Sequence, residues 1–532
     1  MRENLLTLER ANYKKLETKF ENYKKDEEKR INELVTKAVT FAVEETKKTY
    51  EKEINEYKNE INRLKARLGI DSTNSGLPTS KNSIGKQTIQ NNRETSDKPK
   101  GGQAGHPQAK LEYFKEEEIT HKEDLTLDKC PNCGGDLIET NIVKSDIIDV
   151  TVTVTKTRYN IHNYKCKSCH KNVTANSDLP RGASYGNNVN AIALSLMNEA
   201  NTALNKVSSV LSGISNNEIN MSEGYLIKLQ KKSSEKLTNF IYDLKEKVVL
   251  LDRIFWDDTT VNFGIEKPAE GYDEKDLKYL EEGKNKKVRE GTIRFYGDDN
   301  LALLIGHRNK NFDSINDDDI LSRLSENCVV MHDHLLLNYN DKYKFKNAEC
   351  NEHIKRALKK NMGLLPNHKW AGEMRKLLVD TNKEKGELIE NKISSFSNKK
   401  LEEISQKYDE IIKLAYKENE DRDIEKIQAE IDELNLIERL DKFKENHLLF
   451  AYDFSVEFTN NTSERGLRQV KRKLAVSFMF KNANRMKDYA KIISYLETCH
   501  RNGITRFEAA KRLVSNNPYT INEIFPPKEK EE

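Results

Sequence analysis

The sequence has no apolar run long enough to cross a membrane and no large excess of charge of either sign. No stretch reaches the ~18 consecutive apolar residues that a membrane-spanning helix needs. The N-terminal region is rich in Glu and Lys and lacks the apolar centre of a secretory signal, so we expect a cytoplasmic protein. The 90 basic residues nearly balance the 87 acidic ones, so the overall charge does not indicate a polyanionic partner.

Cysteine is scarce too, with seven residues in a chain of 532. Four of them form two C-x-x-C pairs, Cys130 with Cys133 and Cys166 with Cys169. Because structural disulfides are uncommon in the cytosol, the pairs predict a zinc ribbon within residues 113–182, with redox-active or unpaired thiols as the alternative. The β-rich run 147–154 predicts part of a hairpin that brings the pairs together. The other three cysteines have no partner at metal-binding spacing and are interpreted as core or surface thiols: Cys328, Cys350 and Cys499.

The remaining N-terminal half divides by composition. Residues 1–70 carry apolar residues at spacings of three and four, for example Tyr13, Leu16 and Phe20, which predicts a coiled-coil oligomerisation arm; a solvated single helix is the alternative. Residues 71–112 are rich in polar residues, glycine and lysine and predict a flexible basic linker. Residues 183–246 are helical in pattern and predict either a DNA-binding helix-turn-helix element or a helical hairpin packed on the next domain.

Three acidic motifs lie far apart in the rest of the chain. Asp257 ends the apolar run 248–256, which predicts a buried strand, and Asp333 follows a similar run at 328–331. Glu464 opens a helical pattern. Three carboxylates suit two Mg²⁺ (or Mn²⁺) ions, which prefer oxygen ligands and catalyse in-line displacement at phosphorus. Each residue also has a structural alternative: a strand-end turn, a loop, and a capping box at the helix start, respectively.

The sequence around these acidic residues resembles the insertion sequence 66 family of bacterial transposases. The first motif of that family is matched by 257–261 and the second by 332–334. The tyrosine and C-x-A-H-x-x-R that follow the second motif are matched by Tyr339 and 350–356, and the NN-x-x-ER-x-LR motif is matched by 460–468. Three residues differ from the motifs of the family, and none of them is one of the three acidic residues Asp257, Asp333 and Glu464. They are Asp258, Thr260 and Glu352. The choice of Asp257 over Asp258 as the first ligand depends on this resemblance.

The resemblance implies a ribonuclease-H-like α/β catalytic domain over residues 247–505, with a helical insertion at about 367–446 and a C-terminal tail at 506–532. The whole chain is then a multidomain α+β protein. Asp257, Asp333 and Glu464 are implied to be the catalytic Mg²⁺ ligands of a DDE transposase. Such an enzyme cleaves and joins DNA at transposon ends. A catalytically silent, transposase-derived DNA-binding regulator is the alternative.

The same resemblance implies transposon ends and target DNA as partners, a homodimer or larger assembly, accessory proteins of the same element, and a location at the bacterial nucleoid. Basic residues cluster after Glu464, where eight occur up to Lys487. Such a cluster beside metal-binding carboxylates favours phosphate contacts over a merely solvated helix face. The predicted DNA-binding residues are His353, Arg356, Arg465, Arg468, Lys471, Arg472 and Lys473.

Overall fold

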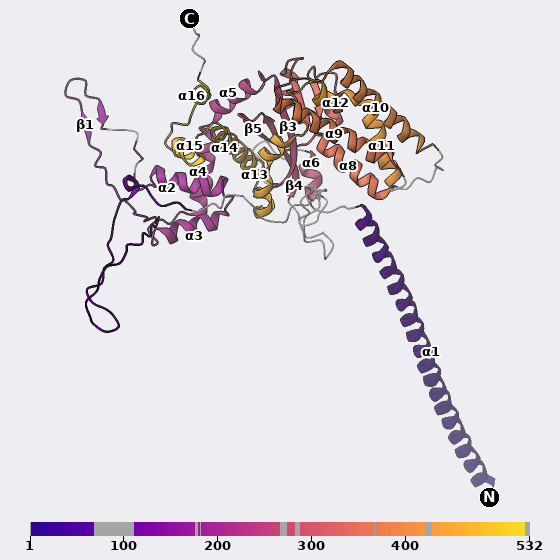
Figure 1. Ribbon diagram of the computed structural model, residues 1–532. Coiled ribbons are helices and arrows are strands. Elements are labelled where there is room, and N and C mark those ends of the chain that lie inside the picture. Colours follow the sequence, from indigo (N-terminus) through magenta and orange to yellow (C-terminus); the bar gives the residue numbers. More distant parts are fainter. Residues whose placement is uncertain are drawn as a thin grey trace.

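The computed structural model describes residues 2–68, 111–175, 179–180, 182–265, 274–281, 288–365, 368–420 and 428–526. Within these ranges the protein is a mixed α+β structure with a long N-terminal helix and a sheet-containing domain (Figure 1). Of the predicted linker, residues 71–110 lie outside the described ranges. None of the helices in the described residues is long and apolar enough to cross a membrane.

Helix α1 (Arg2–Leu68) occupies the segment for which a coiled-coil arm is predicted, and it projects away from the other elements (Figure 1). Between Tyr13 and Ile54, the large apolar side chains that the structure describes are exposed, including Leu16, Phe20 and Leu34. A helix with an uncovered apolar seam is consistent with a partner helix. Self-association of this arm stays a prediction.

The predicted zinc-ribbon segment contains one short hairpin, formed by β1 (Asn163–Lys165) and β2 (Asn172–Thr174), after the short 3-10 helix η2 (Glu116–Glu118). The hairpin encloses Cys166 and Cys169. The prediction that 147–154 forms part of a hairpin is wrong, because this run belongs to no strand and its apolar side chains, such as Ile147 and Val150, are exposed. A β-rich pattern needs a covered face to fold as a strand, and of the apolar side chains in this run only Val154 packs against a core.

A five-stranded sheet forms the centre of residues 247–505, the segment for which a catalytic domain is predicted. Its order is β5-β4-β3-β6-β7; β5, β4 and β3 are antiparallel neighbours, whereas β3, β6 and β7 are parallel. The strands are β3 (Arg253–Gly264), β4 (Val288–Gly297), β5 (Ala302–His307), β6 (Val329–His332) and β7 (Lys346–Glu349). Short elements between them are α6 (Glu274–Glu281), α7 (Phe312–Asp317), η3 (Leu321–Arg323) and η4 (Leu336–Tyr339).

The strand predicted from the run 248–256 is correct only in its second half. Val248 is the last residue of helix α5, Leu250 is exposed, and β3 begins at Arg253. The first apolar residues of the run therefore belong to a helix end that packs on the sheet. Beyond the run, β3 continues for eight residues past Trp256, because β4 pairs with it as far as Gly264. Asp257 lies within the strand.

Helices cover both faces of the sheet. The face that includes Ile254, Trp256 and Val330 shares a core with the four helices preceding the sheet and with the C-terminal helices. The four helices are α2 (Asn187–Asn198), α3 (Leu204–Ile214), α4 (Glu223–Glu235) and α5 (Thr238–Val248). Residues 183–246 therefore pack on the sheet, as expected of a helical hairpin packed on the next domain. Their contact with DNA stays a prediction.

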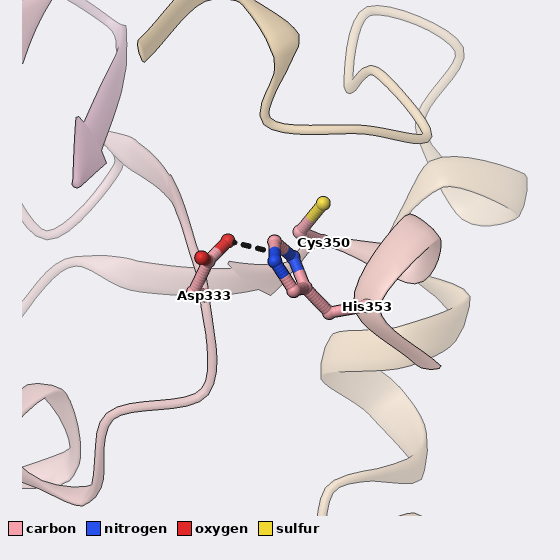
Figure 2. Close-up of side chains that lie close together, drawn as sticks. All are labelled: Asp333, Cys350 and His353. Carbon is pink, nitrogen blue, oxygen red and sulfur yellow. Dashed lines mark ion pairs between the residues drawn. The ribbon is translucent and has the colours of Figure 1, made fainter. Parts of the chain in front are cut away.

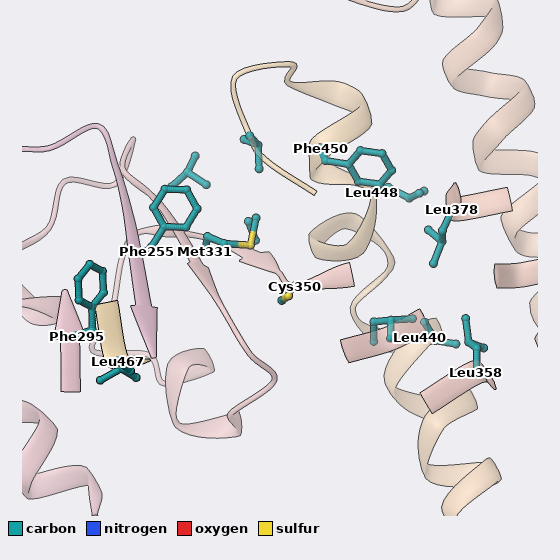
Figure 3. Close-up of a cluster of buried hydrophobic side chains, with 14 of the residues drawn as sticks. Phe255, Phe295, Met331, Cys350, Leu358, Leu378, Leu440, Leu448, Phe450 and Leu467 are labelled. Carbon is teal, nitrogen blue, oxygen red and sulfur yellow. The ribbon is translucent and has the colours of Figure 1, made fainter. Parts of the chain in front are cut away.

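The opposite face, which includes Phe255, Phe295 and Met331, packs against the helices that separate β7 from the C-terminus. These are α8 (Asn351–Leu364), α9 (Trp370–Glu390), α10 (Asn398–Lys417), α11 (Gln428–Lys442), α12 (Lys444–Tyr452) and α13 (Asn461–Ser477). Figure 3 shows this core running from the sheet, past Cys350, to Leu358 and Leu440 on the helices. The helical insertion and the sheet thus share one core.

The C-terminal segment is not a tail. Helix α14 (Ala483–Arg501) packs on β5, and it is followed by α15 (Arg506–Val514) and α16 (Ile521–Ile524). Helix α15 buries Ala509, Ala510 and Leu513 and packs against α2. The prediction of a tail at 506–532 is therefore wrong for its described part, because this short helix buries one apolar face in the core that includes Ile254, Trp256 and Val330.

Candidate active site

Asp257 and Asp333 lie side by side because of the register of two parallel strands. Phe255 of β3 pairs with Met331 of β6, and each aspartate lies two residues further along its strand direction. Side chains two residues apart point to the same face of a sheet. Both carboxylates therefore point to the face that holds Phe255 and Met331, at the C-terminal end of β6.

Asp258 points to the opposite face and has other partners. Its Oδ1 forms an ion pair with Lys310 Nζ at 2.9 Å, and its cross-strand neighbour on β4 is the buried Arg294. A carboxylate that is neutralised in this way has a structural role already. The structure thus favours Asp257 over Asp258 as the residue that interacts with Asp333.

The environment of Asp257 disfavours a negative charge. Burial and the adjacent charge of Asp333 raise the pKa of Asp257 to about 7, against a lowering effect of Lys471. No basic side chain of the described residues forms an ion pair with Asp257 or Glu464. Asp257 is therefore a partly buried carboxylate beside a second carboxylate and has no paired cation among the described residues, an arrangement that suits a hard divalent cation.

Asp333 is held by two neighbours that the sequence did not connect to it. His353 Nδ1 lies 3.0 Å from Asp333 Oδ1, and the two side chains point toward one another (Figure 2). Burial raises the pKa of Asp333, but His353 and the side chain of Asn460 outweigh this effect and hold that pKa below its usual value. For His353, burial lowers the pKa, yet contacts with Asp333 and Cys350 raise it to about 10. The pair is therefore an aspartate and an imidazolium at neutral pH.

Asn460 connects the three elements that carry the acids. It is the N-cap of α13, and its side-chain Nδ2 donates to the carbonyl of Trp256 at 3.0 Å, immediately before Asp257. Its backbone N–H donates to Cys350 Sγ at 3.2 Å, and its carbonyl accepts from the N–H of Glu464 at 3.2 Å. The side chain of Asn460 is fully buried. The bonds to Trp256 and Cys350 join segments that lie far apart in the sequence.

Glu464 lies in the first turns of α13, and no capping box forms at this helix, so the structural alternative for Glu464 is not realised. The helix lies unusually close to the sheet at Gly466, where an added Cβ would be 2.4 Å from a ring carbon of Phe295. Phe295 is the direct cross-strand partner of Asp257. The close contact therefore positions the Glu464 turn over the strand pair that holds Asp257.

Replacing Gly466 with Ala is expected to destabilise the protein, because the new methyl group overlaps the Phe295 ring and α13 must move away from the sheet. Overpacking of this kind costs about 1–3 kcal/mol, more than the ~1 kcal/mol by which Ala improves a helix interior. The measurement is denaturant unfolding. Gly386 of α9 provides the matched control, since a Cβ there meets nothing within 4 Å and Gly386→Ala should stabilise slightly. Equal effects of the two substitutions would contradict the close helix-sheet contact.

A second buried cluster lies next to the acids, around Glu349 at the end of β7. Its fully buried carboxylate contacts His334 Nδ1 at 2.6 Å, Arg439 Nε of α11 at 3.1 Å and the hydroxyl of Tyr339. Burial alone raises the pKa of Glu349, but these partners and His447 of α12 hold it far below its usual value. The cluster fixes the loop after Asp333 to the helical insertion, and sequence analysis did not single out Glu349.

The predicted DNA-binding residues occupy different environments. On α13, Arg468, Lys471 and Arg472 are exposed, whereas Lys473 is half-buried and burial lowers its pKa. Arg465 is exposed and forms an ion pair with Asp299 at 3.2 Å. On α8, Arg356 is exposed, and its nearest acidic partner is Glu352 at 3.7 Å. His353, in contrast, belongs to the acidic site itself.

Each C-x-x-C pair forms a tight turn. The N–H of Gly134 donates to the carbonyl of Cys130 and that of His170 to the carbonyl of Cys166, at 2.8 and 3.0 Å. Backbone N–H groups that face the sulfur atoms lower the pKa of Cys130 and of Cys166. Both turns therefore suit a thiolate, the form that binds zinc.

The four predicted zinc ligands do not meet in one group within the described ranges. Cys133 and Cys169, the second residue of each pair, are exposed, whereas Cys130 and Cys166 are partly buried. No group of three or more metal-binding side chains in this part of the chain includes Cys133 or any other cysteine of the two pairs, which differs from the predicted four-sulfur arrangement. Because a bound zinc ion itself draws thiolates together, the zinc ribbon and the role of Cys133 in it stay predictions.

Within the described ranges, one group of three metal-binding side chains has all its ligand atoms within 4.8 Å of one another: Asp333, Cys350 and His353. Neither Asp257 nor Glu464 belongs to that group. Like-charged carboxylates repel one another, and they approach closely only around a cation. The predicted triad therefore consists of an adjacent pair, Asp257 and Asp333, and a glutamate on a helix docked against the same strands.

Adjacent aspartates in a mixed sheet, a glutamate on a docked helix and a basic outer helix face are features expected of a carboxylate-based enzyme acting on nucleic acid. A family model described as Transposase IS66 family matches residues 182–488, which is more than half of the chain. The chain therefore belongs to the IS66 family of transposases. No curated protein and no solved structure matches it.

Proposed function

We propose that this protein is an active DDE transposase, which cleaves DNA at the ends of an insertion sequence and joins the freed ends to target DNA. The observation that carries the proposal is the adjacent placement of Asp257 and Asp333 on parallel strands, with α13 docked through Gly466 on the cross-strand partner of Asp257. Membership of a transposase family supports the same activity and DNA as the partner.

Asp257, Asp333 and Glu464 fit Mg²⁺ or Mn²⁺, since all three supply oxygen atoms and, among the described residues, neither Asp257 nor Glu464 forms an ion pair with a basic side chain. Two such ions supply activation of the attacking oxygen and stabilisation of the leaving oxygen. The role of His353 and Asn460 is to orient the Asp333 carboxylate, and outer partners of this kind commonly fix the geometry of a metal ligand. The exposed Arg468, Lys471 and Arg472 attract DNA phosphates toward the site.

The proposal also includes the fold of the catalytic domain, a structural zinc ion and the pairing of two copies. A mixed sheet with three antiparallel strands continued by two parallel ones supports a ribonuclease-H-like catalytic domain. The two thiolate-favouring turns support a structural zinc ion in residues 113–182, and the exposed seam of α1 supports pairing of two copies. Transposition requires two DNA ends to be held together, so a dimerising arm has a direct use.

The test is cleavage of a labelled duplex that carries the element's own ends, by the purified protein with Mg²⁺, comparing wild type with Glu464→Gln. We expect nicking at the ends by the wild type and none by the variant, with equal DNA binding by fluorescence anisotropy. Glu438→Gln, an exposed glutamate on α11, is the control and should cleave normally. Cleavage by Glu464→Gln at the wild-type rate would remove Glu464 from the site.

A further inference from the structure

Three side chains of different donor type converge at the ends of β6 and β7. The last pair in the register of these parallel strands is His332 with Glu349, so Asp333 and Cys350 leave adjacent strands at the same edge. His353 follows in the first turn of α8, whose start is fixed by a hydrogen bond from its N–H to the carbonyl of Cys350 at 3.2 Å. Regular elements thus place an oxygen, a sulfur and a nitrogen together.

The three donor atoms are close enough to share one ion. All three lie within 4.8 Å of one another. Cys350 is 1% exposed, whereas the side chains of Asp333 and His353 are about one-third exposed, so Cys350 lies deeper than the other two residues. Figure 2 shows the Asp333 carboxylate and the His353 ring facing one another, with Cys350 beside the ring.

The polar atoms of this group are incompletely satisfied within the protein. Asp333 Oδ1 and His353 Nδ1 are both buried and form an ion pair at 3.0 Å, yet neither makes a hydrogen bond of regular geometry in the described residues. Cys350 Sγ accepts the N–H of Asn460 at 3.2 Å, a contact of the kind that orients metal-binding side chains. A cation that binds here would take the place of the His353 proton and use the oxygen, nitrogen and sulfur atoms together.

The oxygen, sulfur and nitrogen donors of this group prefer a different cation from Mg²⁺, which the three predicted carboxylates would bind. Mg²⁺ takes oxygen ligands and has little affinity for thiolate. A carboxylate, an imidazole and a thiolate together favour Zn²⁺ and its spectroscopic substitutes, and three protein ligands leave a fourth tetrahedral position open.

We propose that Asp333, Cys350 and His353 form a binding site for a thiophilic divalent cation of the zinc class. Because Asp333 belongs to both donor sets, a cation bound to Cys350 and His353 withdraws this carboxylate from the Mg²⁺ site and inhibits DNA cleavage. The inhibition rests on the proposed function, whereas the binding site itself does not.

Cadmium titration of the full-length protein tests the site directly, through the ultraviolet absorption of cadmium-thiolate bonds and the number of ions bound per chain. Cys350→Ser and His353→Gln should each bind one ion fewer than the wild type. The four cysteines of the predicted ribbon contribute equally to all samples. Cys499→Ser removes another fully buried thiol that belongs to no such group, and it should titrate as the wild type does. His353→Gln, at a half-buried position, guards against misfolding of the cysteine variant.

Equal stoichiometry in the wild type, Cys350→Ser and His353→Gln would overturn the site. For the inhibition, cleavage at saturating Mg²⁺ is measured against added Zn²⁺, with each variant normalised to its own rate without zinc. We expect Cys350→Ser to need at least about tenfold more zinc for half-inhibition, the range over which loss of one supporting group alters metal affinity. Equal zinc sensitivity would overturn the competition, while cadmium binding by a protein that never cleaves DNA would overturn only the proposed function.

Discussion

Asp257→Asn is expected to lower DNA cleavage with Mg²⁺ by more than the roughly 10–100-fold typical for residues that only support a metal ligand. The asparagine keeps the size of the side chain but removes the charge that the cation requires. DNA binding should persist, because the exposed arginines and lysines of α13 remain. The measurement is the single-turnover nicking rate on the end-bearing duplex, with anisotropy as the binding assay.

The neighbouring aspartate provides a matched control. Asp258→Asn removes the ion pair with Lys310 on the opposite face of the sheet and leaves the carboxylate next to Asp333 intact. Its cleavage rate should stay within a few fold of the wild type. The reverse result, with Asp258→Asn inactive and Asp257→Asn active, would assign the first ligand to Asp258.

Asp257→Asn should also change how the melting temperature depends on pH in the absence of DNA. The pKa of Asp257 is raised from 3.8 to about 7, so the folded protein keeps a proton that the unfolded chain loses as the pH rises from about 4 to 7. Metal-free wild type thus loses stability across that window. Asparagine stays neutral, so Asp257→Asn should melt at a higher temperature than the wild type at pH 8 and similarly at pH 4. Added Mg²⁺ should raise the melting temperature of the wild type only.

Glu349→Gln is expected to destabilise the fold by about 3–5 kcal/mol, the usual cost of breaking a buried ion pair from one side. The amide leaves Arg439 without its counter-charge and presents a donor where His334 and Tyr339 also donate. Denaturant unfolding measures the loss. Because His334 is adjacent to Asp333, cleavage at a temperature where the variant stays folded should fall as well.

Two comparisons isolate the effect of burial. Glu246 forms a two-pronged pair with Arg323 at 2.8 and 2.7 Å, but about one-third of each side chain is exposed, so Glu246→Gln should cost at most about 1 kcal/mol. Adding Arg439→Met to Glu349→Gln should recover part of the loss, since the unpaired cation is then gone. Similar losses of unfolding free energy from Glu349→Gln and Glu246→Gln would show that the buried cluster contributes no more to stability than a partly exposed ion pair.

Local patterns predicted those parts of the site that depend on neighbouring residues. The apolar run before Asp333 corresponds to β6, and the 3.6-residue period after Glu464 corresponds to α13 with Leu467 and Val470 buried. The same reasoning joined Val248 to the following strand, because an apolar helix end and an apolar strand start look alike over a few residues.

The residues that hold the acidic side chains in place could not be predicted from the sequence, for a different reason. Asn460, Glu349 and Cys350 act through partners 90 or more residues away, such as the pairs Asn460 with Trp256 and Glu349 with Arg439. No periodicity encodes such pairings. The spacing of Cys350 and His353 was a usable signal, since they lie three positions apart at a helix start, but it gains meaning only once the parallel register of β6 and β7 brings Asp333 beside them.

The docking of α13 on Phe295 has a consequence for protein synthesis. Both aspartates and the whole sheet leave the ribosome long before Gly466 and Glu464, which follow the five helices α8 to α12. A nascent or truncated chain that ends within those helices has Asp257 and Asp333 but no glutamate, and the Phe295 ring lacks its helical cover. Such a fragment lacks one of the three proposed metal ligands, and its uncovered apolar surface favours aggregation. Under the proposed function, the active site is therefore assembled only after α13 has been synthesised.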